Sequence, residues 1–168
     1  MQTTLYLLRH GETIENANGI FQGQTPGHLS EKGKKQAAAM RSKVARLHFD
    51  AVLCSDLQRC KDTAGIVLAG TDTTPLYTTL LRERYMGNLA GKPIAGALLD
   101  DSVENAEQVG LRARQLLRII KEKYAGKSLL IISHGYFLHI FQAIIENKQI
   151  DEVNSMDNCE IRKINFSC

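Results

Sequence analysis

The chain has 168 residues, of which 43% are hydrophobic and 23% are charged, and its formal net charge is +3 at pH 7. This length predicts one domain with a hydrophobic core of its own, and no apolar run approaches the ~20 residues that a membrane-spanning helix needs. The charge is mildly basic and scattered along the sequence, so neither a nucleic acid nor a membrane surface is predicted as a partner.

The N-terminus and the cysteines indicate a reducing compartment. Met1–Thr4 lacks the basic n-region of a signal peptide and no long apolar h-region follows it, which predicts a cytoplasmic protein. The cysteines show no CxxC spacing and are too few for a secreted disulfide scaffold, so we expect free thiols, buried or terminal. These residues are Cys54, Cys60, Cys159 and Cys168.

The first predicted element is a strand that ends in a charged loop. The apolar run Leu5–Leu8 is too short for a buried helix and continues directly into Arg9, His10 and Gly11. Arginine offers a fork of donors for phosphate or carboxylate, histidine can act as a base or nucleophile, and glycine lets a ligand approach the backbone. Together these residue types predict an anion site that contains a reactive imidazole.

A loop and a helix follow this strand. Asn16–His28 is polar and rich in glycine, which is typical of a loop. Ser30 stands where an N-cap is expected, and apolar residues then recur at helical spacing as far as Leu47.

A second buried strand is predicted over Ala51–Cys54. Ser55 and Gln58 follow at capping-box spacing, which predicts the start of another helix with Arg59 in its first turn. The N–H groups of such a turn and an arginine beside them form a favourable place for a phosphate group.

The middle of the chain predicts a short strand, a loop and a long helix. Thr73–Thr78 reads as the strand, and Leu81–Gly91 is a loop rich in charge and glycine. From about Asp101 to Tyr124, apolar residues repeat at the spacing of an amphipathic helix.

A third buried strand is predicted over Leu129–Ile132. It too is followed by a histidine and a glycine, and His134 stands just after this strand as His10 does after the first. The next helix, Tyr136–Glu146, is apolar nearly all round and should be buried, and His139 on it is interpreted as structural. Asn158–Phe166 reads as an edge strand, in which a β-bulge would account for a change of phase between its two halves.

This alternation of strands and helices predicts an α/β fold, a three-layer α/β/α sandwich around a mainly parallel, mixed sheet. Ligands bind at the carboxyl ends of strands in such sheets. Arg9, His10, Arg59 and His134 all lie just after predicted strands, so we expect them to meet at one edge.

The sequence resembles the histidine phosphatase superfamily, which includes the cofactor-dependent phosphoglycerate mutases. The resemblance covers nearly the whole chain, and its motifs occur in the order of the family. The matching segments are Arg9-His10-Gly11-Glu12-Thr13 with Asn16, Gln22-Gly23, Leu29-Ser30 through Gly33 with Gln36-Ala37, Ser55-Asp56-Leu57 with Arg59 and Thr63-Ala64, Leu81-Arg82-Glu83 with Gly87 and Gly91, and Ser133-His134-Gly135.

The resemblance implies a phosphomonoesterase that acts through a phosphohistidine on His10. Arg9, Arg59 and His134 would neutralise the phosphoryl oxygens, and Glu83 would serve as general acid and base. So much positive charge around the phosphoryl group leaves no need for a metal ion, and no cofactor is implied.

The same resemblance implies the residues that bind the rest of a phosphorylated small-molecule substrate. Asn16, Gln22, Gly23 and Arg82 are the predicted contacts, whereas Glu12 is interpreted as a structural hydrogen-bond partner.

One alternative is a phosphoglycerate mutase, because Glu83–Gly91 resembles the mutase segment. The predicted cap, at about 81–101, is minimal, and it lacks the long insertion with an arginine pair that covers a mutase site. The segment Lys92–Asp100 offers only Lys92 as a cation. Arg112 and Arg114 lie on the following helix and are expected to face solvent. We therefore expect hydrolysis rather than transfer between two positions of a substrate.

Two further alternatives are a phosphohistidine protein phosphatase and a non-catalytic module that binds phosphoryl ligands. Intact His10 and Glu83 disfavour the non-catalytic module. The substrate stays open among sugar phosphates, a cobamide precursor, nucleotide derivatives and phosphohistidine proteins, as does the oligomeric state.

Overall fold

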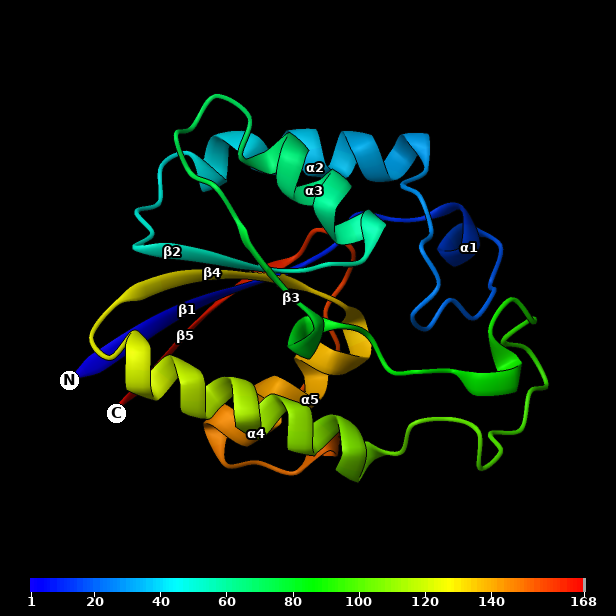
Figure 1. The fold of residues 1–168 in the computed structure, drawn as a ribbon. Coiled ribbons are helices and arrows are strands. Elements are labelled where there is room, and N and C mark those ends of the chain that lie inside the picture. The colour runs from blue at the N-terminus through cyan, green and yellow to red at the C-terminus, as the bar shows by residue number, and fades with distance from the viewer. Residues whose placement is uncertain (168) are drawn as a thin grey trace.

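Five strands form one sheet between two layers of helices in the computed structural model, which describes residues 1–167 (Figure 1). The strand order is β3-β2-β4-β1-β5, and β5 alone runs antiparallel to its neighbour. The predicted α/β/α sandwich around a mainly parallel, mixed sheet is confirmed. The strands are β1 (Gln2–Arg9), β2 (Ala51–Ser55), β3 (Leu76–Thr78), β4 (Ser128–Ser133) and β5 (Ile161–Ser167).

Two helices cover each face of the sheet. Figure 1 shows α2 and α3 on one side and α4 and α5 on the other, with the short α1 beyond the end of β1. Single helical turns lie in the connecting segments, at Thr79–Leu81, Gly87–Leu89 and Ile150–Glu152. The helices are α1 (Ile14–Ala17), α2 (Glu31–Val44), α3 (Gln58–Val67), α4 (Ala106–Lys123) and α5 (Gly135–Glu146).

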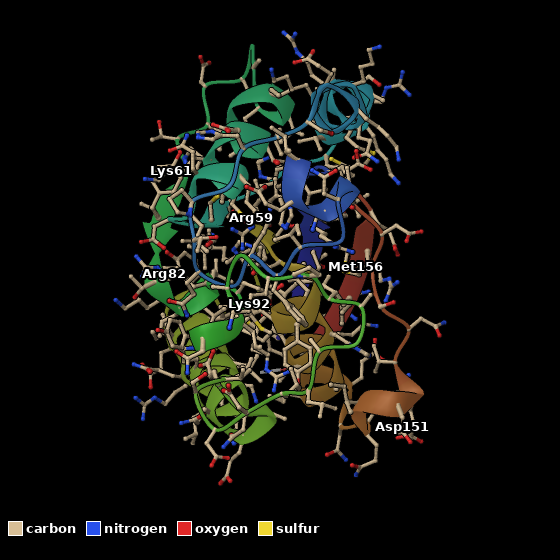
Figure 2. All side chains as sticks on the ribbon, turned by 90° about the vertical axis from the view of Figure 1, so that its right-hand side faces the viewer. Arg59, Lys61, Arg82, Lys92, Asp151 and Met156 are labelled. Atoms are coloured by element: carbon tan, nitrogen blue, oxygen red, sulfur yellow. The ribbon has the colours of Figure 1, made fainter. Side chains whose placement is uncertain are left out.

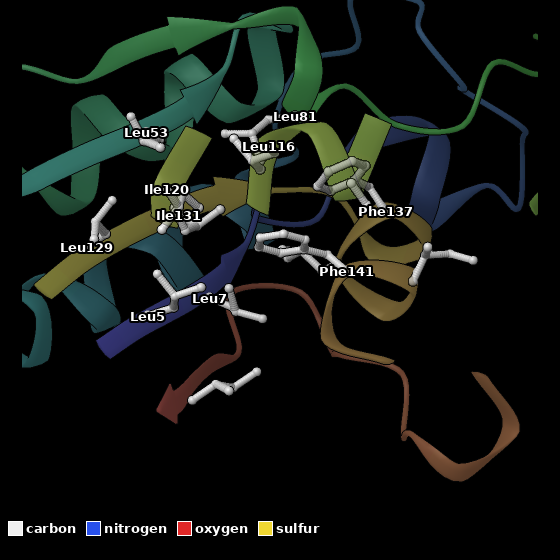
Figure 3. Close-up of a cluster of buried hydrophobic side chains, with 14 of the residues drawn as sticks. Leu5, Leu7, Leu53, Leu81, Leu116, Ile120, Leu129, Ile131, Phe137 and Phe141 are labelled. Carbon is white, nitrogen blue, oxygen red and sulfur yellow. The ribbon is translucent and has the colours of Figure 1, made fainter. Parts of the chain in front are cut away.

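The central strands are buried on both faces, which explains their continuous apolar runs. Successive residues of β1 point to opposite faces of the sheet. Leu5 and Leu7 pack against α4 and α5, whereas Leu8 packs against α2 and α3. Figure 3 shows the first of these clusters, in which Phe137 and Phe141 of α5 stack with ring centroids 5.7 Å apart. The buried helix predicted over Tyr136–Glu146 is thus present.

Two predicted helix starts are wrong. The long helix begins at Ala106 rather than near Asp101, because Asn105 and Gln108 form a capping box there. Ser55 is not the N-cap of α3. Leu57 occupies that position without a side-chain hydrogen bond, and the Ser55 hydroxyl accepts hydrogen bonds from the Leu57 N–H at 3.3 Å and from the His134 ring at 2.8 Å. Ser30 does cap α2, since its Oγ accepts a hydrogen bond from the Gly33 N–H at 3.0 Å.

The last strand is shorter than predicted. Asn158 and Cys159 form a turn, with Cys159 at a positive φ of 57°, and β5 pairs with β1 without a bulge from Ile161 onward. The change of phase in the apolar spacing therefore marks the place where the turn ends and the strand begins. His139 is structural as predicted, because its Nε2 donates to the Val153 carbonyl at 2.6 Å.

Three of the four cysteines are free and buried, as predicted: Cys54, Cys60 and Cys159. Cys168 lies outside the described residues. Across residues 1–167, every helix is too short or too polar to cross a membrane.

Candidate active site

Both motif histidines lie at the same edge of the sheet because their strands are parallel neighbours. Arg9 of β1 pairs with Ser133 of β4, so His10 and His134 leave the sheet side by side. Their ring centroids are 5.2 Å apart. Figure 2 looks onto this edge, with Arg59 near the middle of the view.

His10 is held as a neutral imidazole with one nitrogen free. Its Nδ1 lies 2.7 Å from the Gly11 carbonyl oxygen, which can only accept, so Nδ1 carries the proton. Burial, and then the positive charge of Arg59, hold the pKa of His10 well below its usual range. The lone pair of Nε2 is therefore available for attack on an electrophile.

His134 has the opposite tautomer. The Arg59 Nε donates to its Nδ1 at 3.1 Å, and its Nε2 donates to the Ser55 hydroxyl at 2.8 Å. Burial and the Arg59 charge hold the pKa of His134 well below its usual range. The Cys60 thiol is packed against the same ring, and burial raises the pKa of that thiol to about 12, so it stays protonated.

Arg59 is almost completely buried and connects the helix to the loop after α1. One terminal nitrogen donates to the Thr25 carbonyl at 2.8 Å and the other to the Gly23 carbonyl at 2.6 Å. Gly23 has a positive φ of 56°, and a Cβ there would lie 2.8–2.9 Å from Met86. Glycine at this position therefore lets the loop carry its carbonyl groups to the arginine.

Arg9 has a donor to spare. One terminal nitrogen donates to the Met156 carbonyl at 2.6 Å, whereas its Nε is buried without a hydrogen-bond partner within residues 1–167. The second terminal nitrogen also makes no hydrogen bond within these residues, and because Arg9 lines the adjacent cavity, an anion there can accept from its guanidinium.

Glu83 lies at the N-terminus of α5. Its carboxylate accepts hydrogen bonds from the backbone N–H groups of Arg84 at 2.9 Å, Phe137 at 3.0 Å and Tyr136 at 3.2 Å. These bonds fix the carboxylate at the edge where the histidines emerge.

A cavity of about 210 Å³ joins these groups. This volume is more than enough for several water molecules and leaves room for a phosphoryl group. One part of the wall is polar and another apolar. The lining residues are Arg9, His10, Asn16, Ile20, Phe21, Gln22, Gly23, Arg59, Glu83, Arg84, Met86, Ile94 and Tyr136.

The predicted substrate contacts divide into two groups. Asn16, Gln22 and Gly23 line the cavity, although the Gln22 amide nitrogen already donates to Glu15 at 2.6 Å. Arg82 does not line it: its guanidinium pairs with the Asp56 carboxylate at 2.5–2.7 Å, toward the left edge of Figure 2. His134 also stands behind the lining residues and reaches the site through Arg59.

Sequence reasoning missed six lining residues: the apolar Ile20, Phe21, Met86 and Ile94, and two with polar groups, Arg84 and Tyr136. The Arg84 guanidinium lies 4.8 Å from the Tyr136 ring centroid, and its Nε donates to the Glu104 carbonyl at 2.5 Å. Its terminal nitrogens have no hydrogen bond within residues 1–167 and stay available to a ligand. Arg84 and Tyr136 each closely follow a motif residue, Glu83 or His134, and this adjacency was the signal available in the sequence.

A neutral imidazole, a buried and a half-buried arginine, and a carboxylate around one cavity can accept a phosphoryl group and release it. The fold and this site define an α/β enzyme of phosphoryl transfer. The chain belongs to the histidine phosphatase superfamily (branch 1), which it matches over residues 5–167, and it is a phosphatase.

Known proteins agree with this assignment. A probable phosphatase of Schizosaccharomyces pombe is 36% identical, with 82% of this chain and 71% of the relative aligned. The metal-independent phosphoserine phosphatase of Arabidopsis thaliana is 32% identical, with 89% of this chain and 73% of the relative aligned. Among solved structures, YhfR of Bacillus stearothermophilus superposes with a TM-score of 0.86 at 27% identity, covering 96% of this chain and 90% of YhfR.

Proposed function

We propose that this chain hydrolyses phosphate monoesters of small metabolites through a phosphohistidine on His10. The observation that carries the proposal is the His10 ring, which is neutral, lines the cavity and has Nδ1 fixed on the Gly11 carbonyl, so that Nε2 is the nitrogen left for attack. The similarity to phosphatases such as the Arabidopsis enzyme supports hydrolysis as the outcome.

In the first step Nε2 attacks phosphorus in line as the bond to the ester oxygen breaks. Arg9 and Arg59 stabilise the charge on the remaining phosphoryl oxygens. Glu83 gives a proton to the leaving oxygen. In the second step water attacks phosphorus, the N–P bond breaks, and Glu83 takes the proton of that water.

His134 acts in this scheme through Arg59, which it orients. Asn16 and Gln22 contact the phosphoryl group or the adjacent part of the substrate, and Arg84 and Tyr136 face the leaving group. The guanidinium of Arg82 is assigned instead to its ion pair with Asp56.

The chain acts in this proposal as one domain with a minimal cap at about 81–101, in the cytoplasm, on small molecules rather than on nucleic acids or membranes. The cap segment Lys92–Asp100 is largely exposed, so water reaches the phosphohistidine. Net hydrolysis is therefore expected in place of mutase activity.

The test is a rapid acid quench with ³²P-labelled substrate. The natural enzyme should yield an acid-labile phosphoenzyme, and His10→Ala should form none while retaining its fold by circular dichroism. A folded His10→Ala variant with most of its activity would refute the proposal. Incubation with 3-phosphoglycerate and catalytic 2,3-bisphosphoglycerate checks the outcome: efficient formation of 2-phosphoglycerate with little free phosphate would establish a mutase.

A further inference from the structure

The pair Glu104–Arg112 lies behind the Glu83 segment rather than in solvent. Arg112 was expected to be exposed, but its side chain is 20% exposed and that of Glu104 is 13% exposed. Two parallel bonds join them: Nε to Oε1 at 2.9 Å, and a terminal nitrogen to Oε2 at 2.8 Å. A guanidinium and a carboxylate joined at two points have a defined mutual orientation.

Arg112 uses its remaining donors on the backbone that leads to Glu83. One terminal nitrogen donates to the Arg82 carbonyl at 2.9 Å and to the Leu80 carbonyl at 3.2 Å. The guanidinium also lies 5.4 Å from the Phe137 ring centroid, and the Phe137 N–H is a donor to the Glu83 carboxylate. Arg112 therefore contacts both segments that meet at this carboxylate.

Glu104 holds the backbone on the other side of Glu83. Its Oε2 accepts from the Tyr85 N–H at 3.0 Å, and its own N–H donates to the Tyr85 carbonyl at 2.9 Å. Its carbonyl accepts from the Arg84 side chain. The residues before and after Glu83 are thus attached to one ion pair.

Neither member of the pair lines the cavity. We propose that Glu104 and Arg112 are positioning residues for Glu83, which fix the place of its carboxylate relative to the leaving oxygen. This inference rests on the proposed role of Glu83 as general acid, because a group that transfers a proton must stay within hydrogen-bond reach of the reacting atom.

A positioning role differs from a purely structural one in its dependence on the leaving group. Loss of the pair should slow the release of a poor leaving group, which needs a proton from Glu83. Release of p-nitrophenolate needs little protonation, so this substrate should be affected less. A general loosening of the fold would slow both reactions equally.

The test compares Arg112→Met with Arg118→Met, a matched control on the same helix whose arginine is 71% exposed. For an alkyl phosphate, Arg112→Met should lower kcat/KM, which reports the steps up to release of the leaving group, roughly tenfold to hundredfold, the effect of a misplacement of about 1 Å. The loss with p-nitrophenyl phosphate should be roughly threefold or less. Arg118→Met should match the natural enzyme with both substrates.

A double-variant cycle completes the test. Adding Arg112→Met to Glu83→Gln should cause no further loss on the alkyl phosphate, because the group being positioned is gone. Equal losses of the single variant on both substrates, or full additivity, would overturn the inference. If Arg112→Met does not fold, Arg112→Lys and Glu104→Gln are measured in the same way. Equal losses of Glu83→Gln itself on both substrates would instead overturn the proposed acid, and the inference with it.

Discussion

The substitution Gly33→Ala tests how closely α2 must approach the loop that carries His10. A Cβ at position 33 would lie 2.0 Å from the Glu12 carbonyl oxygen, whereas ordinary contacts begin at 3.4 Å. Relief therefore requires α2 and this loop to separate by about 1.4 Å. That same carbonyl accepts the Ser30 N–H at 2.9 Å, so the separation also breaks a hydrogen bond at the start of α2.

The expected loss of stability follows from two opposing effects. Overpacking against backbone costs about 3 kcal/mol, and the better helix propensity of alanine returns about 1 kcal/mol. The free energy of unfolding should thus fall by about 2 kcal/mol, which lowers the Tm by about 4–8 °C for a chain of this size. His10, Gly11 and Glu12 are consecutive, so a shift of the loop at Glu12 also moves the nucleophile. We therefore expect kcat to fall roughly hundredfold.

The matched control is Gly65→Ala, within α3, where a Cβ would meet no atom within 4 Å. This variant should gain about 0.5–1 kcal/mol of stability and keep its kcat. Urea unfolding and p-nitrophenyl phosphate turnover measure both quantities. A Gly33→Ala variant with the stability and kcat of the natural enzyme would refute the close-approach reasoning.

Five other outcomes are expected. Because the pKa values of His10 and His134 are held well below 6.5 in the folded state, the unfolded chain binds more protons, so the urea midpoint should fall as pH drops below 6.5. Ser55→Ala should lower kcat by releasing the His134 ring, whereas Ser55→Thr should retain activity. The Cys60 thiol, with its pKa raised to about 12, should resist iodoacetamide at pH 8 until urea unfolds the protein. Vanadate should inhibit as a five-coordinate mimic of in-line transfer, and EDTA should leave activity unchanged.

Four of these outcomes have a contrary result that would be decisive. A urea midpoint that rises as the pH is lowered from 6.5 to 5 would contradict the assignment of His10 and His134 as neutral. Equal activity of the two Ser55 variants would show that the Ser55 hydroxyl does not hold the His134 ring for catalysis. Rapid alkylation of native Cys60 would show that the thiol is reactive. Activity lost to EDTA and restored by a divalent metal would overturn the metal-free mechanism.

The sequence predicted the sheet edge well because strand ends are local features. A run such as Leu5–Leu8 followed at once by Arg9 and His10 marks both a buried strand and the place where it stops. Parallel pairing with β4 then brings His134 to the same place.

The start of α4 and the exposure of Arg112 could not be predicted in this way. Val103 fits the helical spacing, but it packs on Met86 and Leu89 from an irregular segment, so periodicity alone misplaced the helix start. Arg112 looks like a surface residue on its own helix. It donates to the carbonyl groups of Leu80, Arg82 and Glu83, which only the tertiary structure brings to it.

The position of β1 in the sheet has a consequence for biosynthesis. β1 is translated before the other four strands, and both its neighbours in the sheet, β4 and β5, follow only after residue 127. At ~5–20 residues per second, the nascent β1 waits roughly 6–24 s before β4 begins to emerge. During that time an apolar strand with two unpaired edges invites aggregation or chaperone capture. The active site is completed, and β1 is protected, in the same late step of synthesis, when β4 and β5 pair with it.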